Sequence, residues 1–382
     1  MTLAVSRRAL GVDSLVVGCA FLSSEEDAVA IVKEALAAGV VEFDVAPLYG
    51  KGVMEKRLGK AIGALPESEA ARVRVATKAG RLLREQVHND FSGAGAEDSL
   101  RESLDRLGVG RVHCLRIHDP NDSPERPAGV DEVGVAFGAG GMVERLVSMR
   151  ANGAIARASL GMNTNVESGM SNLHVPSDAL PPSLVHGAPS EVLRVLGAAA
   201  PGTFDEALLA GGWTLLSQTG LAAMAECQRL GVEVAVAGVF ATGLLVGQQQ
   251  CEGAHCALLR RSAKSPLARP GRGALMWSSQ PQNRPLVRYA YQRAPAEKVA
   301  LAERWAELAA EHGTTLSAVA VAFAWLPDCV SKVVLGVSDA RQLEANLEAV
   351  RRSAEVPLAL FHEARTRGLL GAEVPLPALS AG

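Results

Sequence analysis

Four polar residues that can take part in acid/base chemistry stand directly behind predicted β-strands. Asp44 and Tyr49 follow one strand, Lys78 follows the next, and His118 ends the one after that. The carboxyl ends of parallel strands meet at one face of a barrel, so we expect these side chains to converge. Each residue alone has an ordinary structural explanation, such as a helix cap for Asp44 or a hydrogen-bonded histidine for His118. Their joint placement favours an active site.

Proton transfer by a tyrosine is the chemistry that this set predicts. A tyrosine with its usual pKa of about 10 is a poor base, and a neighbouring ammonium group favours its ionised form. Lys78 would supply that ammonium, and Asp44 would keep the lysine charged and oriented. His118 could hydrogen-bond the substrate oxygen. We therefore expect Tyr49 to be the acid/base, with a pKa below 10.

Eight short runs rich in β-branched residues supply the strands that would position these side chains. Helical patterns separate the runs, and strict alternation of strand and helix is typical of a parallel sheet covered by helices. Eight repeats favour a closed (β/α)8 TIM barrel of the α/β class over an open sheet. The predicted strands are Leu15–Gly18, Val41–Asp44, Val73–Thr77, Val112–His118, Ala156–Leu160, Glu206–Leu209, Val232–Ala237 and Lys332–Gly336.

The clearest helical pattern covers Glu25–Ala38, with a capping box at Ser23 and Glu26 and a stop at Gly39. Four other helices follow from apolar periodicity. They are Ala96–Arg106, Leu221–Leu230, Pro295–His312 and Ala340–Ser353.

The chain is predicted to form one barrel domain over residues 1–382, with insertions near 121–140, 165–202 and 247–285. All three insertions come after strands. Loops after strands gather on the catalytic face of a barrel, so we expect a rim or lid there.

Composition limits the classes of function. The formal net charge of −3 gives no broad basic field, which argues against nucleic acid as a partner. No apolar run is long enough to span a membrane. Arg7-Arg8 before Leu15–Phe21 faintly resembles a signal peptide, but a first barrel strand explains the run better. Nothing in the sequence indicates an oligomeric state.

The cysteines are too sparse for a disulfide framework, so we expect reduced thiols and a cytoplasmic protein. The close pair Cys251 and Cys256 could form a metal clip, but no second pair at ligand spacing accompanies it. A surface loop without metal is the simpler interpretation. The six cysteines are Cys19, Cys114, Cys227, Cys251, Cys256 and Cys329.

The motifs around the four polar residues resemble those of the aldo-keto reductases. Phe43–Gly50 (FDVAPLYG), followed by Glu55 and Leu58-Gly59, is similar to the tyrosine motif of that family. Ala76–Lys78 and Arg116–Asp119 resemble its lysine and histidine motifs, in the right order. The resemblance extends from about residue 18 to residue 350. It implies that Asp44, Tyr49, Lys78 and His118 are the family's catalytic tetrad.

The resemblance also implies a nicotinamide cofactor lying extended over the barrel mouth. The best candidate for a Rossmann-type loop, Gly138–Gly141, lacks a glycine at Val143 and a suitable acidic residue after it. Without the family pattern, Gly243 would be an ordinary turn glycine and Asn346 a solvated helix residue. The implied cofactor positions are Gly18, Asn163 for the carboxamide, Phe240, Ala241, Thr242, Gly243 and Leu244 for the pyrophosphate, and Gly336, Ser338, Gln342 and Asn346 for the adenosine end.

The cofactor prediction is NAD or NADP, with NAD favoured. Many family members carry Lys or Arg where this chain has Gly336, Ser338 and Gln342, and those cations pair with the 2′-phosphate of NADP. NADP stays open if arginines such as Arg261 or Arg341 reach the site.

Two aromatic residues are candidates for stacking and substrate contact. The aromatic residue that stacks on the nicotinamide in the family is replaced by Ala237, and Trp213 is the candidate to compensate. Tyr291 could line a sugar site, although an aromatic packed before the next helix explains it equally well.

Segments Phe204–Leu216 and Phe240–Leu245 are similar to aldose 1-dehydrogenases that act on L-fucose, L-galactose or D-arabinose. The resemblance implies oxidation of the anomeric carbon of a free sugar to a lactone. The alternatives are pyridoxal oxidation or general aldehyde reduction in the same family. A more distant alternative is a non-enzymatic nicotinamide-sensing subunit.

Overall fold

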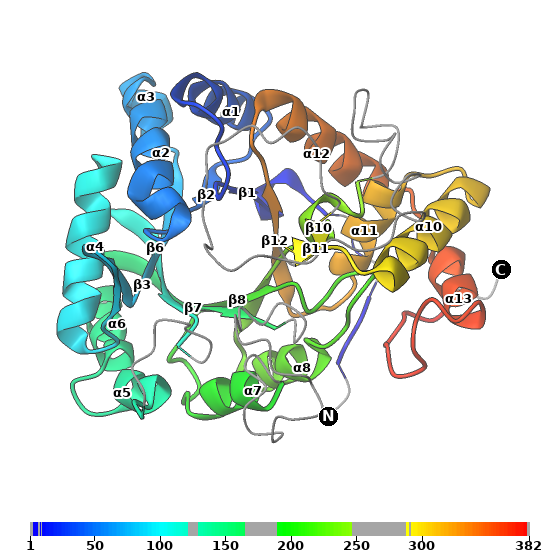
Figure 1. Cartoon of the computed structure of the whole chain (residues 1–382). Helices are drawn as coiled ribbons and strands as arrows, with labels where there is room; N and C mark the ends of the chain where they lie inside the picture. Colours follow the sequence, from blue (N-terminus) through cyan, green and yellow to red (C-terminus); the bar gives the residue numbers. More distant parts are fainter. Residues whose placement is uncertain are drawn as a thin grey trace, which may run out of the picture.

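Eight parallel strands close into a barrel in the order β1-β12-β9-β8-β7-β6-β3-β2. This computed structural model describes residues 3–6, 8, 10–120, 129–164, 189–246, 288–289 and 292–379. Figure 1 shows the helices as a ring around the strands. The barrel strands are β1 (Leu15–Gly18), β2 (Glu42–Asp44), β3 (Arg74–Ala79), β6 (Val112–His118), β7 (Ile155–Asn163), β8 (Glu206–Ala210), β9 (Glu233–Ala237) and β12 (Val330–Gly336).

The predicted fold class is confirmed, and so is each of the eight predicted strands. β1 and β6 have the predicted bounds, whereas β7 runs three residues further, to Asn163. Most of the strands are buried along their length, because helices cover one face and the barrel interior covers the other.

Helices follow the strands in sequence and pack on the outside of the barrel (Figure 1). All five predicted helices are present. The helices are α1 (Glu25–Ala37), α2 (Val53–Gly63), α3 (Glu67–Ala70), α4 (Gly93–Leu107), α5 (Glu132–Phe137), α6 (Met142–Ala151), α7 (Pro189–Gly197), α8 (Leu221–Leu230), α10 (Ala296–Glu311), α11 (Leu316–Ala324), α12 (Ala340–Ser353) and α13 (Leu358–Thr366).

The start of α1 differs by one residue from the prediction. Ser24, not Ser23, is the N-cap, and its side chain accepts a hydrogen bond from the backbone N–H of Asp27 at 3.0 Å. Ser23 donates instead to the Asp27 carboxylate, so both hydroxyls fasten the first turn. Gly39 has φ +90°, a conformation that glycine adopts without strain, and it ends the helix as predicted.

Regular structure occupies part of two predicted insertions. Residues 189–197 of the predicted 165–202 insertion form α7, which packs against α8. The short helix α5 lies within the predicted 121–140 insertion. Residues 121–128, 165–188 and 247–287 are outside the described residues, which leaves the predicted lid untested.

Two hairpins also lie outside the barrel. β4 (Arg81–Leu83) and β5 (Val87–Asn89) pair directly after β3, at the carboxyl end of the barrel. β10 (Arg288–Tyr289) and β11 (Gln292–Arg293) form a second antiparallel pair.

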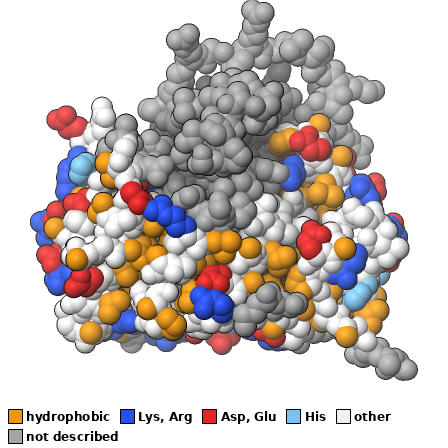
Figure 2. Space-filling model, turned by 90° about the horizontal axis from the view of Figure 1, so that it is seen from below, with side chains coloured by type: hydrophobic (Ala, Val, Ile, Leu, Met, Phe, Trp, Pro, Cys, Tyr) orange, Lys and Arg blue, Asp and Glu red, His pale blue; other side chains and the backbone are white. Residues whose placement is uncertain are grey.

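The main hydrophobic core lies between the strands and the helices, and a smaller one fills part of the barrel interior. The inner cluster consists of Val16, Leu208, Ala235 and Val334. Charged side chains occupy the rest of the interior, as described below. On the face shown in Figure 2, acidic and basic side chains intermingle with hydrophobic ones over the described surface. No helix within the described ranges is long and apolar enough to cross a membrane.

Candidate active site

Three of the four predicted catalytic side chains are in direct contact at the carboxyl ends of β2 and β3. The Lys78 Nζ atom donates to Asp44 Oδ1 at 2.6 Å and to the Val45 carbonyl at 2.9 Å. The same ammonium lies 4.6 Å from the centre of the Tyr49 ring. Adjacent strands bring Asp44 and Lys78 together, because Asp44 pairs with Ala76 in the parallel register.

His118 joins this group from the end of β6. Its ring lies edge-on to the Tyr49 ring, with centroids 6.2 Å apart and planes at 87°. The side chain is buried, and within the described residues its Nδ1 atom has no hydrogen-bond partner. A buried ring nitrogen without a partner is a place for a ligand oxygen or hydroxyl to bind.

The electrostatics of Tyr49 differ from the sequence-based expectation. Burial raises the pKa of the Tyr49 phenol, and the positive charge of Lys78 lowers it by less, so the net shift is upward. The predicted pKa below 10 is therefore wrong for the protein alone. Desolvation, which the sequence does not reveal, outweighs the ammonium.

Lys78 is positively charged, whereas His118 is neutral. Burial is the largest single influence and lowers the pKa of Lys78, but the Asp44 carboxylate and Tyr49 together raise it by more, so the lysine stays protonated. Burial and the charges of Arg81 and Lys78 bring the pKa of His118 well below its usual value. A neutral imidazole beside a fixed ammonium can hydrogen-bond a substrate oxygen without competing for the proton of Tyr49.

A buried glutamate fixes the segment that carries Tyr49. Glu55, on α2, accepts from the Thr77 hydroxyl at 2.7 Å and from the Arg106 Nε at 2.5 Å. α2 also lies very close to α4, since a Cβ at Gly59 would be 2.2 Å from the Leu107 carbonyl oxygen. Glu55 and Gly59 thus hold α2 against its neighbours.

Sequence reasoning missed Arg116, which shares Asp44 with Lys78. The fully buried guanidinium donates to Asp44 Oδ2 at 3.0 Å and to the Ser159 hydroxyl at 2.7 Å, and it also pairs with Glu206. The signal was available, because Arg116 precedes His118 by two residues and therefore lies on the same face of the strand.

The interior charges continue toward the other end of the barrel. Lys332 pairs with Glu206 at 2.9 Å and with Glu42 at 2.7 Å. Cations and carboxylates therefore alternate from Lys78 down to Glu42. This alternation lets the barrel bury charged groups, because each carboxylate has a cationic partner.

Asp119 is a second residue that the sequence analysis did not single out. Its carboxylate accepts from the Asn163 backbone N–H at 3.0 Å and from the Asn163 side-chain amide at 3.1 Å, and lies 3.8 Å from Arg81 Nη2. It fixes the orientation of Asn163, the residue predicted to contact the cofactor's carboxamide.

The structure brings the predicted adenosine-end residues together at β1, β12 and the start of α12. Gly18 pairs with Gly336, and a Cβ at Gly18 would lie 3.1 Å from the Gly336 Cα. Asn346 donates to the Gly336 carbonyl at 3.1 Å, and the Gln342 side chain accepts from the Ser338 N–H at 3.0 Å. Nothing lies within 4 Å of a Cβ built at Gly336, which leaves exposed backbone that a ligand can approach.

The predicted pyrophosphate segment forms a strained turn after β9. Ala241 and Thr242 have φ values of 48° and 59°, and Gly243 has φ 95° with open space around it. Phe240 and Leu244 flank this 3-10 turn. The other described non-glycine residues with positive φ are Lys51 and Asp119, which also follow barrel strands. Strain of this kind gathers at functional sites, and here it gathers at the face that holds Tyr49.

The two predicted aromatic residues have different outcomes. Trp213 is buried in the core, where it stacks on Phe323 with centroids 4.8 Å apart and donates its indole N–H to the Phe323 carbonyl at 3.2 Å. These contacts give Trp213 a packing role, and its role against the nicotinamide or substrate stays a prediction. Tyr291 lies outside the described residues.

The chain belongs to the aldo/keto reductase family, whose profile matches residues 15–168 and 207–356. The barrel, the family match and the similar dehydrogenases make it an NAD(P)-dependent oxidoreductase. A glycerol dehydrogenase of Gluconobacter oxydans superimposes with a TM-score of 0.59 at 17% identity, covering 100% of this chain and 98% of the other. An aldo-keto reductase of Bacillus halodurans gives 0.55 at 20% identity, covering 96% and 97%. These two structures support the fold.

Three proteins that are similar in sequence have names that give the reaction each of them catalyses. A D-threo-aldose 1-dehydrogenase of Pseudomonas sp is 28% identical over 378 residues, covering 93% of this chain and 92% of the relative. A pyridoxal 4-dehydrogenase of Microbacterium luteolum is 25% identical over 403 residues, covering 96% and 97%. An L-galactose dehydrogenase of Arabidopsis thaliana is 42% identical over 96 residues, which are 25% of this chain and 29% of the relative.

Proposed function

We propose that the protein is an aldose 1-dehydrogenase that oxidises the anomeric carbon of a free sugar of D-arabinose, L-fucose or L-galactose type to a lactone. The observation that carries the proposal is the contact between Tyr49, Lys78 and Asp44 in a chain that aligns over nearly its whole length with a D-threo-aldose 1-dehydrogenase. The aligned segment of the L-galactose dehydrogenase supports the same substrate class.

In the proposed reaction, the phenolate form of Tyr49 takes the proton of the anomeric hydroxyl and becomes the neutral phenol. A bound nicotinamide supplies the acceptor for the hydrogen that leaves the anomeric carbon with its electron pair. The ammonium of Lys78, fixed by Asp44, stabilises the phenolate form of Tyr49. The unpartnered nitrogen of His118 binds the reacting oxygen, and the buried setting strengthens these interactions.

The described residues fit a nicotinamide cofactor, and we propose NAD as the preferred form. Gly336 and the open turn at Gly243 leave backbone that a dinucleotide can approach. Asp339 caps α12, where its carboxylate accepts from the Gln342 N–H at 3.0 Å and lies 3.3 Å from the Ser338 hydroxyl. A carboxylate at this position would repel the additional phosphate of NADP.

Pyridoxal oxidation is the second candidate, because the pyridoxal 4-dehydrogenase also aligns over almost the full chain. The same tyrosine and lysine would serve that reaction, so the site geometry does not separate the two. The difference lies in the groups that recognise the substrate away from the reacting carbon.

A substrate panel tests the proposal directly. Purified protein is assayed with D-arabinose, L-fucose, L-galactose and pyridoxal, each with NAD and with NADP, and with simple aldehydes and NADH or NADPH. Each reaction is followed by the absorbance of the reduced cofactor. We expect one of the three sugars to give the highest kcat/KM. Turnover of pyridoxal or aldehydes with no sugar oxidation between neutral and alkaline pH would reject the aldose proposal.

A further inference from the structure

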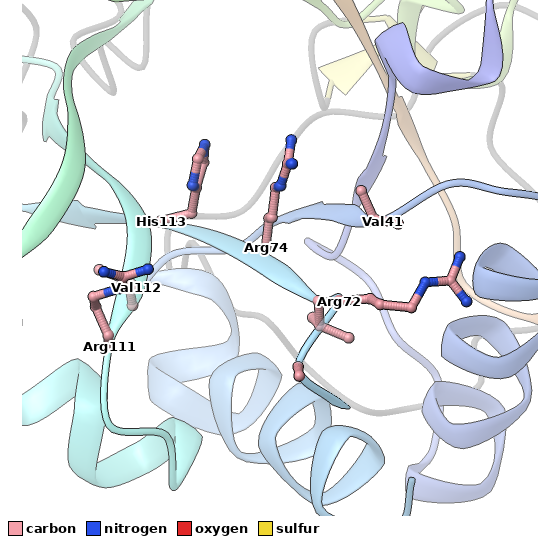
Figure 3. A pocket seen from close by; sticks show the side chains of 8 residues that line it. Val41, Arg72, Arg74, Arg111, Val112 and His113 are labelled. Atoms are coloured by element: carbon pink, nitrogen blue, oxygen red, sulfur yellow. The ribbon is translucent and has the colours of Figure 1, made fainter. Parts of the chain in front are cut away.

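A cavity of about 390 Å³ opens at the amino-terminal ends of β2, β3 and β6. β3 begins at Arg74 beside this cavity and reaches Lys78 at the catalytic end, so the length of the strand separates the two places. Figure 3 shows the side chains that line the cavity. They belong to Val41, Ala71, Arg72, Val73, Arg74, Arg111, Val112 and His113.

The polar lining of this cavity is cationic. Arg72, Arg74, Arg111 and His113 are its polar side chains, and none of the lining residues is acidic. The side chains of Arg74 and Arg111 make no hydrogen bond or ion pair with any part of the chain that the structure describes. In Figure 3 the side chains of Arg74 and His113 extend side by side from neighbouring strands.

Cations deeper in the barrel already have acidic partners. Lys332 pairs with Glu42 and Glu206, and Arg157 pairs with Glu233 at 2.8 Å. The side chains of Arg74 and Arg111, in contrast, have no acidic partner among the described residues. Guanidinium groups without partners that share a cavity with an imidazole have the donors that a phosphate group requires.

We propose that this cavity is a second ligand site, which binds a small phosphate-bearing anion through Arg74, Arg111 and His113. A volume of about 390 Å³ lies in the range of small-molecule sites. The site is concave and local, whereas nucleic-acid binding needs an extended basic surface. The proposal concerns residues outside the catalytic group and does not depend on which substrate the active site takes.

His113 provides a readout of occupancy that is independent of turnover. Its pKa is lowered by burial and by Lys332, Arg74 and Arg157, while Glu42 acts in the opposite direction. Arg72 and Arg111 are the other charged groups of the lining. A bound anion would favour the protonated imidazole and raise this pKa. Binding should therefore take up a proton and tighten as the pH falls below neutrality.

The test is a titration with inorganic pyrophosphate at low ionic strength, with NAD saturating so that the cofactor's own diphosphate region is filled. Calorimetry gives the affinity, and NMR follows the His113 imidazole. We expect 1:1 saturable binding and an upward shift of the His113 pKa. Arg74→Gln and Arg111→Gln should each weaken binding at least tenfold. The control Arg101→Gln, an exposed arginine on α4, should bind as the wild type does.

Three results would overturn the proposal. The first is no saturable binding of pyrophosphate at millimolar concentrations, or equal affinity in Arg74→Gln and wild type. The second is equal binding of citrate, which would show a general anion site instead of a phosphate site. The third is much tighter binding of a DNA duplex, which would show a surface for a polymer.

Discussion

Replacing the buried Arg116 with leucine should lower the free energy of unfolding of the protein. The guanidinium is fully buried and contacts Asp44, Ser159 and Glu206, so its removal leaves two buried carboxylates with one cation fewer. Breaking a buried ion pair by removing one partner costs about 3–5 kcal/mol. Because Lys78 and Lys332 still pair with the two carboxylates, we expect the lower end, a loss of about 3 kcal/mol in the free energy of unfolding.

Urea unfolding at pH 7 measures this loss, with Arg150→Leu as the matched control. Arg150 pairs with Asp205 near the surface, so its replacement should cost about 1 kcal/mol or less. The double variant Arg116→Leu/Glu206→Leu should be more stable than the sum of the single losses predicts, because both halves of the pair are gone. If Arg116→Leu lowers the free energy of unfolding no more than the control does, the alternating buried charges from Lys78 to Glu42 do not stabilise the barrel in the way we describe.

Three further predictions concern charge and pH. In the protein without ligands, the Tyr49 phenol should titrate above pH 10, because burial raises its pKa. Ultraviolet difference spectra of wild type against Tyr49→Phe measure this pKa, and a value below 10 would contradict the prediction. Burial raises the pKa of Glu206, but Arg116 and Lys332 lower it by more, so that it falls from 4.5 to about 2. The ionised Glu206 therefore stabilises the fold by about 3 kcal/mol above pH 4.5, and this stabilisation is lost as the pH falls toward 2. Glu206→Gln should flatten that stability profile in acid unfolding, and an unchanged slope would refute the assignment. Ser338→Arg should raise kcat/KM for NADP relative to that for NAD by about tenfold or more. An unchanged ratio would mean that the 2′-phosphate of NADP does not bind next to residue 338.

The sequence was sufficient for the barrel and for the grouping of the tetrad. Strand periodicity placed Asp44, Lys78 and His118 at strand ends, and parallel topology then required those ends to meet. Tyr49 was singled out by its place just behind the second strand, and the family motif added Glu55. The strand pattern and the motif each lie within a short stretch of sequence, so both can be recognised in one sequence.

The missed features depend on contacts between distant parts of the chain. Arg116 and Glu206 are 90 residues apart, and only the register of β6, β7 and β8 makes them partners. The same reason applies to Trp213, whose stacking on Phe323 follows from how α11 packs. The sign of the Tyr49 pKa shift depends on desolvation by the folded chain, which no motif encodes.

The central claim is that Tyr49 transfers the proton in a site that oxidises aldoses. The most direct measurement compares kcat of wild type and Tyr49→Phe for the best sugar with saturating NAD, alongside the Kd for NAD from a fluorescence titration. The account predicts a loss in kcat of about 10²–10⁴-fold, because the positioned group that accepts the proton is removed, with the Kd unchanged within about twofold. A variant that keeps kcat within a few-fold of the wild type would contradict it.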